Sequence, residues 1–308
     1  MTTSLRPAPF GRVLTAMVTP FTADGALDLD GAARLATYLV DHGNDGLVIS
    51  GTTGESPTTT DDEKERLLRA VLDAVGDRAT VVAGVGTNDT RHTIELAQRA
   101  EKAGAHGLLV VTPYYSKPPQ AGLLAHFRQV ADATGLPVML YDIPGRTGTA
   151  IEPETMVRLA EHERIVAVKD AKGDFEASSW VLARTDLAYY SGDDKNTLPL
   201  LAIGAVGVVG VPTHVFGTQT GAMIAAYLRG DVDGALALHR QLLPVFTGFF
   251  RTQGVILAKA ALRLAGLPGG PVRPPLVDAT AEQVARLRED MAAAGFTEFA
   301  EGAEERRG

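Results

Sequence analysis

The sequence alternates eight times between a short apolar run and an amphipathic helical pattern. The apolar runs are continuous, as expected for parallel strands that are covered on both faces. They lie at residues 13–18, 46–50, 80–85, 107–111, 137–143, 165–171, 187–191 and 207–211. The helical patterns lie at residues 29–42, 60–75, 90–103, 120–133, 153–161, 174–183, 196–203 and 215–228. Eight strand–helix units favour an α/β fold of the closed TIM (β/α)8 barrel type over an open, doubly wound sheet.

The end of the chain has a different pattern. Only helical patterns remain beyond residue 230, at 231–243, 254–264 and 279–293. We therefore predict a (β/α)8 barrel catalytic domain at 1–230, a C-terminal helical extension at 231–296 and a mobile charged tail at 297–308. No G-x-G-x-x-G pattern follows the first strand, which weakens the dinucleotide-binding alternative.

Composition excludes several classes of partner. The chain has 29 Lys and Arg against 37 Asp and Glu, a net charge of −8, and it lacks a basic run. Such a chain is a poor candidate for nucleic acid or for anionic membranes. There is no cysteine, and the seven histidines are scattered, so no metal site is expected. Residues 1–14 lack the apolar core of a signal peptide, and no membrane span is found, so we expect a cytoplasmic location.

Lys169 stands near the end of the sixth apolar run. Strand alternation places Ala167, Lys169 and Ala171 on one face, and Val166 and Val168 on the other. Because the valine face suits packing against helices, we predict that Lys169 points into the barrel. Burial would lower the pKa of its amine, and a neutral amine can form a Schiff base with a ketone. The alternative is a lysine whose head reaches back to solvent.

Other polar side chains follow the predicted strands, at the end of the barrel where such enzymes carry their chemistry. They are Thr52, Thr53, Tyr114, Tyr115, Tyr141 and Arg146. Each could have a plainer role, because threonines satisfy turn N–H groups, tyrosines pack in cores and interfaces, and arginines lie on surfaces. Together with an inward lysine, however, phenols and hydroxyls can relay protons and a guanidinium can bind a carboxylate. The set indicates a Schiff-base aldolase.

Acidic residues near the expected site are assigned structural roles. Glu55 follows a glycine turn and is expected to be a hydrogen-bond partner, not an acid catalyst. Asp193 and Asp194 are interpreted as a helix N-cap pair in preference to a metal site.

Five ordered motifs match a known family. They are GTTGES at 51–56, VTPYYSKPP at 111–119, YDIPGRTG at 141–148, VKDAKGD at 168–174 and SGDD at 191–194. On these motifs the chain resembles the class I pyruvate aldolase superfamily typified by dihydrodipicolinate synthase and N-acetylneuraminate lyase. The resemblance is strongest to synthases of actinobacterial type, and it covers roughly residues 12–295. It implies a TIM-barrel lyase that works through a Schiff base.

The resemblance implies how pyruvate is bound. Lys169 would form an imine with the ketone of pyruvate. Thr53 and the backbone near Val209 would hold the carboxylate, and Gly192 would leave room beside the site. Tyr141 would move protons as proton donor and acceptor.

The resemblance also implies the second half of the reaction. Arg146 would hold L-aspartate 4-semialdehyde, whose condensation with pyruvate gives 4-hydroxy-tetrahydrodipicolinate, the entry step of diaminopimelate and lysine biosynthesis. Thr52 and Tyr115 would complete the proton relay, with Tyr115 reaching into a neighbouring subunit's site. The expected assembly is therefore a homodimer or homotetramer, without metal or organic cofactor.

A second, regulatory site is implied in altered form. Synthases inhibited by lysine line a dimer-interface site with His, His and Glu, where this chain has Asp61, Lys64 and His92. Other positions of that site match, namely Ser56, Asn88 and Tyr114. An added lysine and a lost glutamate disfavour a cationic amino acid, so we predict weak or absent inhibition by lysine.

Two alternatives stay open at this point. The chain could be another class I pyruvate-dependent aldolase or lyase, acting on a sugar acid or a 2-oxo acid; Arg146 favours the synthase. It could also be a non-catalytic barrel that binds a ligand or a partner. The presence of both Lys169 and Tyr141 argues against that.

Overall fold

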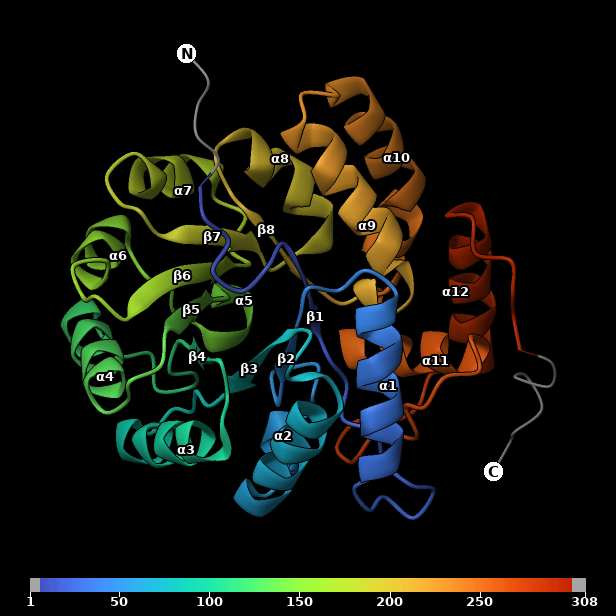
Figure 1. The fold of residues 1–308 in the computed structure, drawn as a ribbon, viewed down its shortest axis with the longest axis horizontal. Helices are drawn as coiled ribbons and strands as arrows, with labels where there is room; N and C mark the ends of the chain where they lie inside the picture. Colours follow the sequence, from blue (N-terminus) through green and yellow to red (C-terminus); the bar gives the residue numbers. More distant parts are fainter. Residues whose placement is uncertain (1–5, 301–308) are drawn as a thin grey trace.

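Eight parallel strands form a closed barrel in the computed structural model, which describes residues 6–300. The barrel closes where β1 pairs with β8, as Leu14 lies opposite Val209. The strands are β1 (Val13–Ala16), β2 (Gly46–Ile49), β3 (Thr80–Gly84), β4 (Gly107–Val111), β5 (Val138–Asp142), β6 (Ile165–Asp170), β7 (Ala188–Ser191) and β8 (Gly207–Gly210). Each strand is followed by a helix on the outside, which confirms the TIM barrel (Figure 1).

The outer helices begin and end close to the predicted residues. They are α1 (Leu29–Asp41), α2 (Asp61–Val75), α3 (Thr90–Ala103), α4 (Gln120–Asp132), α6 (Pro153–Leu159), α7 (Phe175–Leu182), α8 (Thr197–Ala202) and α9 (Thr213–Leu228). The start of α2 is fixed by a reciprocal capping box, in which Thr60 and Glu63 each accept the other's backbone N–H. Such a cap stabilises a helix by about 1 kcal/mol.

Short helical turns occur in the loops at the carboxyl ends of the strands. They are η1 (Ser56–Thr58), α5 (Pro144–Thr147) and η2 (Asp194–Asn196). These turns are too short for a periodic apolar pattern, so the sequence did not predict them as helices. None of the helices formed by residues 6–300 combines the length and apolar character needed to cross a membrane.

The apolar residues form two separate cores, as the continuous strand runs predicted. One lies between strands and helices, and the other fills the barrel. On β6, Ala167 belongs to the inner core and Val168 to the outer one, which agrees with the predicted alternation. Val166 was predicted to face the helices together with Val168. That prediction was wrong, because Val166 packs against the inner core. A bulge between β5 and β6 leaves Val166 outside the regular register, since Val138 lies opposite Ile165 and the next residue of β5 lies opposite Ala167.

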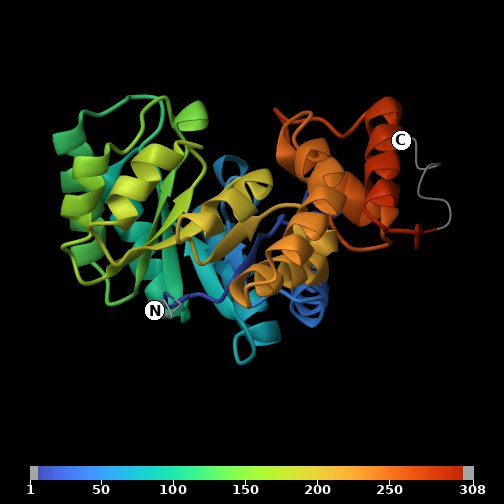
Figure 2. The same cartoon turned by 90° about the horizontal axis from the view of Figure 1, so that it is seen from above.

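The C-terminal extension stands at one side of the barrel (Figure 2). It contains α10 (Val232–Gly248), α11 (Gly254–Leu264) and α12 (Ala281–Ala293). The prediction that the first of these helices ends at residue 243 was wrong, because α10 continues through Pro244. Val245 and Phe246 are fully buried, and their packing offsets the loss of the helical hydrogen bond that the missing N–H of Pro244 would have made.

The predicted tail, 297–308, lies mostly outside the described residues. Of its residues, 297–300 are described, and the backbone N–H of Ala300 donates to the carbonyl of Leu264 at 2.8 Å.

Candidate active site

Lys169 is the penultimate residue of β6, with its side chain inside the barrel, as the alternation predicted. The residue is 5% exposed, and its backbone lies in register with Tyr141 on β5 and Tyr190 on β7. Burial lowers the pKa of the amine to about 8; the negative charge of Asp194 acts in the opposite direction, and the positive charge of Arg146 lowers it further. A sizeable fraction of the amine is therefore neutral near neutral pH, which is what a Schiff-base nucleophile requires.

Tyr141 lies directly beside this amine. Lys169 Nζ is 4.3 Å from the centre of the Tyr141 ring. Burial raises the pKa of the phenol to about 12, while the nearby Arg146 charge and the Thr52 side chain act to lower it. The phenol therefore stays protonated, and the Thr52 hydroxyl on the same cavity wall offers a route along which a proton can move away from Lys169.

A cavity of about 390 Å³ opens next to Tyr141 at the carboxyl end of the barrel. Its lining includes polar residues from three loops, with Thr52 after β2, Tyr114 and Tyr115 after β4, and Arg146 after β5. The volume is sufficient for two small acids. The cavity thus brings together five of the strand-end residues that the sequence singled out, namely Thr52, Tyr114, Tyr115, Tyr141 and Arg146. Thr53, Gly192, Val209 and Lys169 are not part of its lining, and Lys169 reaches it only through contact with the Tyr141 ring.

Gly192 lies against the aliphatic part of Lys169. A methyl group at this position would sit 2.9 Å from Lys169 Cγ and 3.1 Å from Ala171 Cβ. A larger residue here would therefore displace the lysine, while the role of Gly192 in leaving room for the substrate stays a prediction. Val209 is fully buried in the inner core on β8, and Thr53 is buried in the turn after β2.

The loops around the cavity hold strained backbone. Among residues 6–300, the non-glycine residues with positive φ are Ser50, Glu55, Tyr115 and Lys117. All of them lie in the loops after β2 and β4, and each such conformation costs of order 1–3 kcal/mol. Tyr115 has φ 74° and is 89% exposed, so this loop presents a phenol at the rim of the cavity with little support from its own chain.

Asp194 is a member of the site that the sequence did not reveal. The predicted N-cap pair was right in position for Asp193 and wrong for Asp194, since Asp193 is the N-cap residue of η2 without a capping side-chain hydrogen bond and Asp194 is the first residue of η2. Instead, Asp194 is fully buried and accepts the N–H of Val211 at 3.2 Å. Burial raises its pKa to about 7, and the charge of Lys169 partly offsets that rise. One indication of a role for Asp194 in the site was present in the sequence, namely its place in the SGDD motif directly after a strand.

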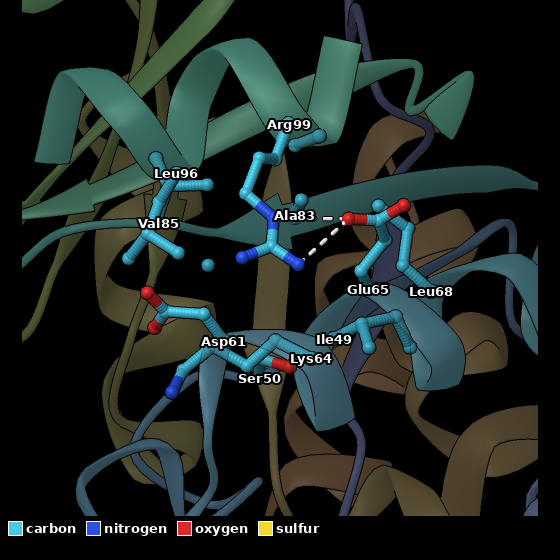
Figure 3. Close-up of a pocket in the computed structure, with 12 residues that line it drawn as sticks. Ile49, Ser50, Asp61, Lys64, Glu65, Leu68, Ala83, Val85, Leu96 and Arg99 are labelled. Carbon is cyan, nitrogen blue, oxygen red and sulfur yellow. Dashed lines mark hydrogen bonds and ion pairs between the residues drawn. The ribbon is translucent and has the colours of Figure 1, made fainter. Parts of the chain in front are cut away.

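The residues of the implied regulatory site divide between two pockets. Ser56 and Tyr114 line the main cavity, whereas Asp61 and Lys64 line a much smaller pocket of about 30 Å³ between α2 and α3. In Figure 3 the second pocket is crossed by Arg99, which reaches from α3 toward Glu65 on α2.

The charged groups around the small pocket already have partners within the chain. His92 Nε2 lies 2.9 Å from the carboxylate of Asp61, and Lys64 Nζ donates to the carbonyl of Thr59 at 2.6 Å. Asn88 is exposed on the loop before α3. Within residues 6–300, no group of three or more His, Cys, Asp or Glu side chains is placed to hold a metal ion.

Fold and site together define a class of protein. A buried lysine of lowered pKa beside a protonated tyrosine, at the carboxyl end of a closed parallel barrel, is the arrangement of a Schiff-base aldolase. The dihydrodipicolinate synthetase family model matches residues 9–294, and the chain belongs to this family. This confirms the family that the motifs indicated.

Individual relatives are similar over almost their whole length. The chain is 67% identical to 4-hydroxy-tetrahydrodipicolinate synthase 2 of Streptomyces coelicolor, over 95% of this chain and 98% of the relative. It is 69% identical to 4-hydroxy-tetrahydrodipicolinate synthase of Kineococcus radiotolerans, over 94% of both chains. A solved structure of the synthase from Cyanidioschyzon merolae with lysine bound has a TM-score of 0.92 at 45% identity, covering 94% of this chain and 99% of that chain.

Proposed function

We propose that this enzyme condenses pyruvate with L-aspartate 4-semialdehyde to give 4-hydroxy-tetrahydrodipicolinate, in the lysine branch of amino-acid biosynthesis. The proposal depends chiefly on the buried Lys169 amine, which lies 4.3 Å from the centre of the Tyr141 ring. Tyr141 in turn lines a cavity that is also bordered by Arg146. The two actinobacterial relatives carry the name of this activity. The reaction predicted from the sequence is thus the one for which they are named.

The first step joins pyruvate to Lys169. The neutral amine attacks the ketone carbon to give a carbinolamine, which loses water to form the imine. Tyr141 donates the proton that leaves with the hydroxyl and recovers one through Thr52, which lines the same cavity. Thr53 and the backbone near Val209 hold the pyruvate carboxylate, and Gly192 leaves room beside the lysine.

The second step forms the carbon–carbon bond. Transfer of a methyl proton to the Tyr141–Thr52 relay converts the imine to an enamine. The enamine carbon attacks the aldehyde of the semialdehyde, and the relay returns a proton to the aldehyde oxygen, which becomes the hydroxyl of the product. Arg146 lies on the cavity wall, where its guanidinium can bind the semialdehyde carboxylate through two hydrogen bonds. The amino group of the condensed chain then attacks the imine carbon, which closes the ring and releases Lys169.

A second copy of the chain completes the proton relay. Tyr115 is strongly exposed at the cavity rim and has a strained backbone, which suits a side chain that enters the site of a neighbouring subunit. The proposal therefore includes a homodimer or homotetramer, acting in the cytoplasm without a metal or organic cofactor.

A comparison of turnover between candidate substrates tests this function. With pyruvate present, we expect steady turnover of L-aspartate 4-semialdehyde and no comparable turnover or cleavage of sugar acids. Turnover of a sugar acid without turnover of the semialdehyde would instead assign the chain to the lyases of the same superfamily.

A further inference from the structure

A buried ion pair joins the C-terminal extension to the turn that follows β2. Lys259 Nζ on α11 lies 2.6 Å from Glu55 Oε1, and both side chains are at most 1% exposed. Glu55 is the fifth residue of the GTTGES turn, whose second and third residues are Thr52 and Thr53. Neither residue lines the catalytic cavity, but Glu55 belongs to the segment that borders it.

Both members of the pair are held by further contacts. Lys259 Nζ donates to the carbonyl of Pro271 at 2.7 Å and lies 4.3 Å from the centre of the Phe21 ring. The other carboxylate oxygen of Glu55 accepts the backbone N–H of Arg273 at 2.8 Å. A buried carboxylate is therefore matched by one cation and one N–H, both supplied by residues of the extension.

A second contact ties the extension to the far side of the same turn. The guanidinium of Arg273 forms two hydrogen bonds with the carboxylate of Glu63, at 2.6 and 2.9 Å, and donates to the carbonyl of Thr58 at 2.8 Å. Glu63 also caps the start of α2 through Thr60. The extension therefore holds the segment from Glu55 to the first turn of α2 at two points.

The conformation of the turn explains why such an anchor is needed. Glu55 has φ 54°, a left-handed conformation that is strained for a residue other than glycine. Its N–H donates to the carbonyl of Thr52 at 3.1 Å, so the angle adopted at Glu55 is linked directly to the backbone of Thr52. A strained backbone persists only where its surroundings fix it, and here the fixed contacts come from α11 and the loop after it.

We propose that Glu55 and Lys259 are positioning residues through which the C-terminal extension orders the pyruvate-binding turn. This inference rests on the proposed function, since it assigns Thr52 and Thr53 to that turn. Stability alone does not require an ion pair here, because a buried pair is often no more stabilising than apolar residues of similar volume. Its presence beside Thr52 and Thr53 is explained by the geometry that it imposes on them.

The test compares three variants, Lys259→Met, Glu55→Gln and the double variant, in the full-length chain. The first readout is the pyruvate concentration that half-saturates borohydride trapping, with pyruvate as the sole substrate. The second readout is the melting temperature. Either single change leaves one buried charged group without its partner, whereas the double change removes both charges and should recover most of the melting temperature.

We expect the double variant to keep a raised half-saturating pyruvate concentration, about tenfold above that of the unmodified chain, although its melting temperature recovers. A purely structural ion pair would instead let both readouts recover together, and that result would overturn the proposal. If a single variant fails to fold, the double variant still decides between the two outcomes.

An ion pair elsewhere in the extension provides the control. Arg251 and Asp290 link the end of α10 to α12, away from the turn after β2. Arg251→Met should lower the melting temperature without changing the half-saturating pyruvate concentration. An equal loss of pyruvate binding in this control would show that general loosening of the extension is the cause. Absence of any adduct in the unmodified chain would contradict the proposed function and not this inference.

Discussion

The amine of Lys169 lies 4.3 Å from the centre of the Tyr141 ring, because β5 and β6 pair with these two residues in register. Burial shifts the pKa of both side chains, in opposite directions. It lowers the pKa of the amine to about 8 and raises that of the phenol to about 12. The pair therefore presents a nucleophile that can be neutral next to an acid that remains protonated.

The pKa of Lys169 predicts how imine formation depends on pH. With a pKa of about 8, roughly one amine in ten is neutral at pH 7, and the fraction levels off above the pKa. The rate of pyruvate adduct formation, measured by rapid trapping, should therefore rise with pH up to about 8 and then level off. Asp194→Asn should move the midpoint to lower pH, because the aspartate charge opposes the fall in the lysine pKa. A rate that keeps rising to pH 10 would indicate an amine of ordinary pKa.

Gly192→Ala should inactivate the enzyme while leaving the fold intact. The added methyl group would lie 2.9 Å from Lys169 Cγ, and the lysine must move to accommodate it. A displacement of this kind can lower kcat by about 100-fold, whereas overpacking costs about 1–3 kcal/mol of stability. Gly145→Ala is the matched control, because a methyl group there has nothing within 4 Å. Equal kcat values for the two variants would contradict the steric role of Gly192.

Arg146→Ala should impair use of the semialdehyde and spare the pyruvate adduct. Loss of a charge-assisted hydrogen bond of about 1.5–3 kcal/mol corresponds to a rise of roughly 10- to 150-fold in KM for the semialdehyde. Steady-state kinetics with each substrate varied in turn measures the two effects separately. Arg146→Lys keeps the charge without the planar fork and should be intermediate. If Arg146→Ala abolished the pyruvate adduct, the assignment of this arginine would be wrong.

Lysine should inhibit this enzyme weakly or not at all. Lys64 adds a positive charge where lysine-sensitive synthases carry histidine, and the carboxylate of Asp61 is already paired with His92. Initial rates measured with sub-millimolar lysine should equal those without it. The double variant Lys64→His and His92→Glu should be inhibited more strongly by lysine than the unmodified chain. Half-inhibition of the unmodified chain at sub-millimolar lysine would refute the prediction.

The fold and the centre of the site were predictable because they depend on local patterns. Continuous apolar runs and helical periodicity predicted the barrel, and strand alternation predicted that Lys169 points inward. The bulge at Val166 could not be predicted, because it depends on how β5 and β6 pair.

Residues that act through distant partners were harder to predict. Asp194 was interpreted from its immediate neighbours as a cap, while its actual environment is set by Val211 and the Lys169 side chain. The role of Lys259 depends on Glu55, more than two hundred residues earlier. One signal was present: Lys259 stands in the middle of a helix whose other faces are apolar and buried. A lysine in such a helix needs a partner, but the sequence does not identify it.

If Lys169 carries the substrate as an imine, borohydride reduction with pyruvate should fix that imine, and peptide mass spectrometry should locate it. We expect one reduced pyruvate adduct, located on the peptide that contains Lys169, and none in Lys169→Arg. Prior addition of the semialdehyde should reduce the amount trapped. An unmodified Lys169 peptide, or an adduct on another lysine, would contradict the account.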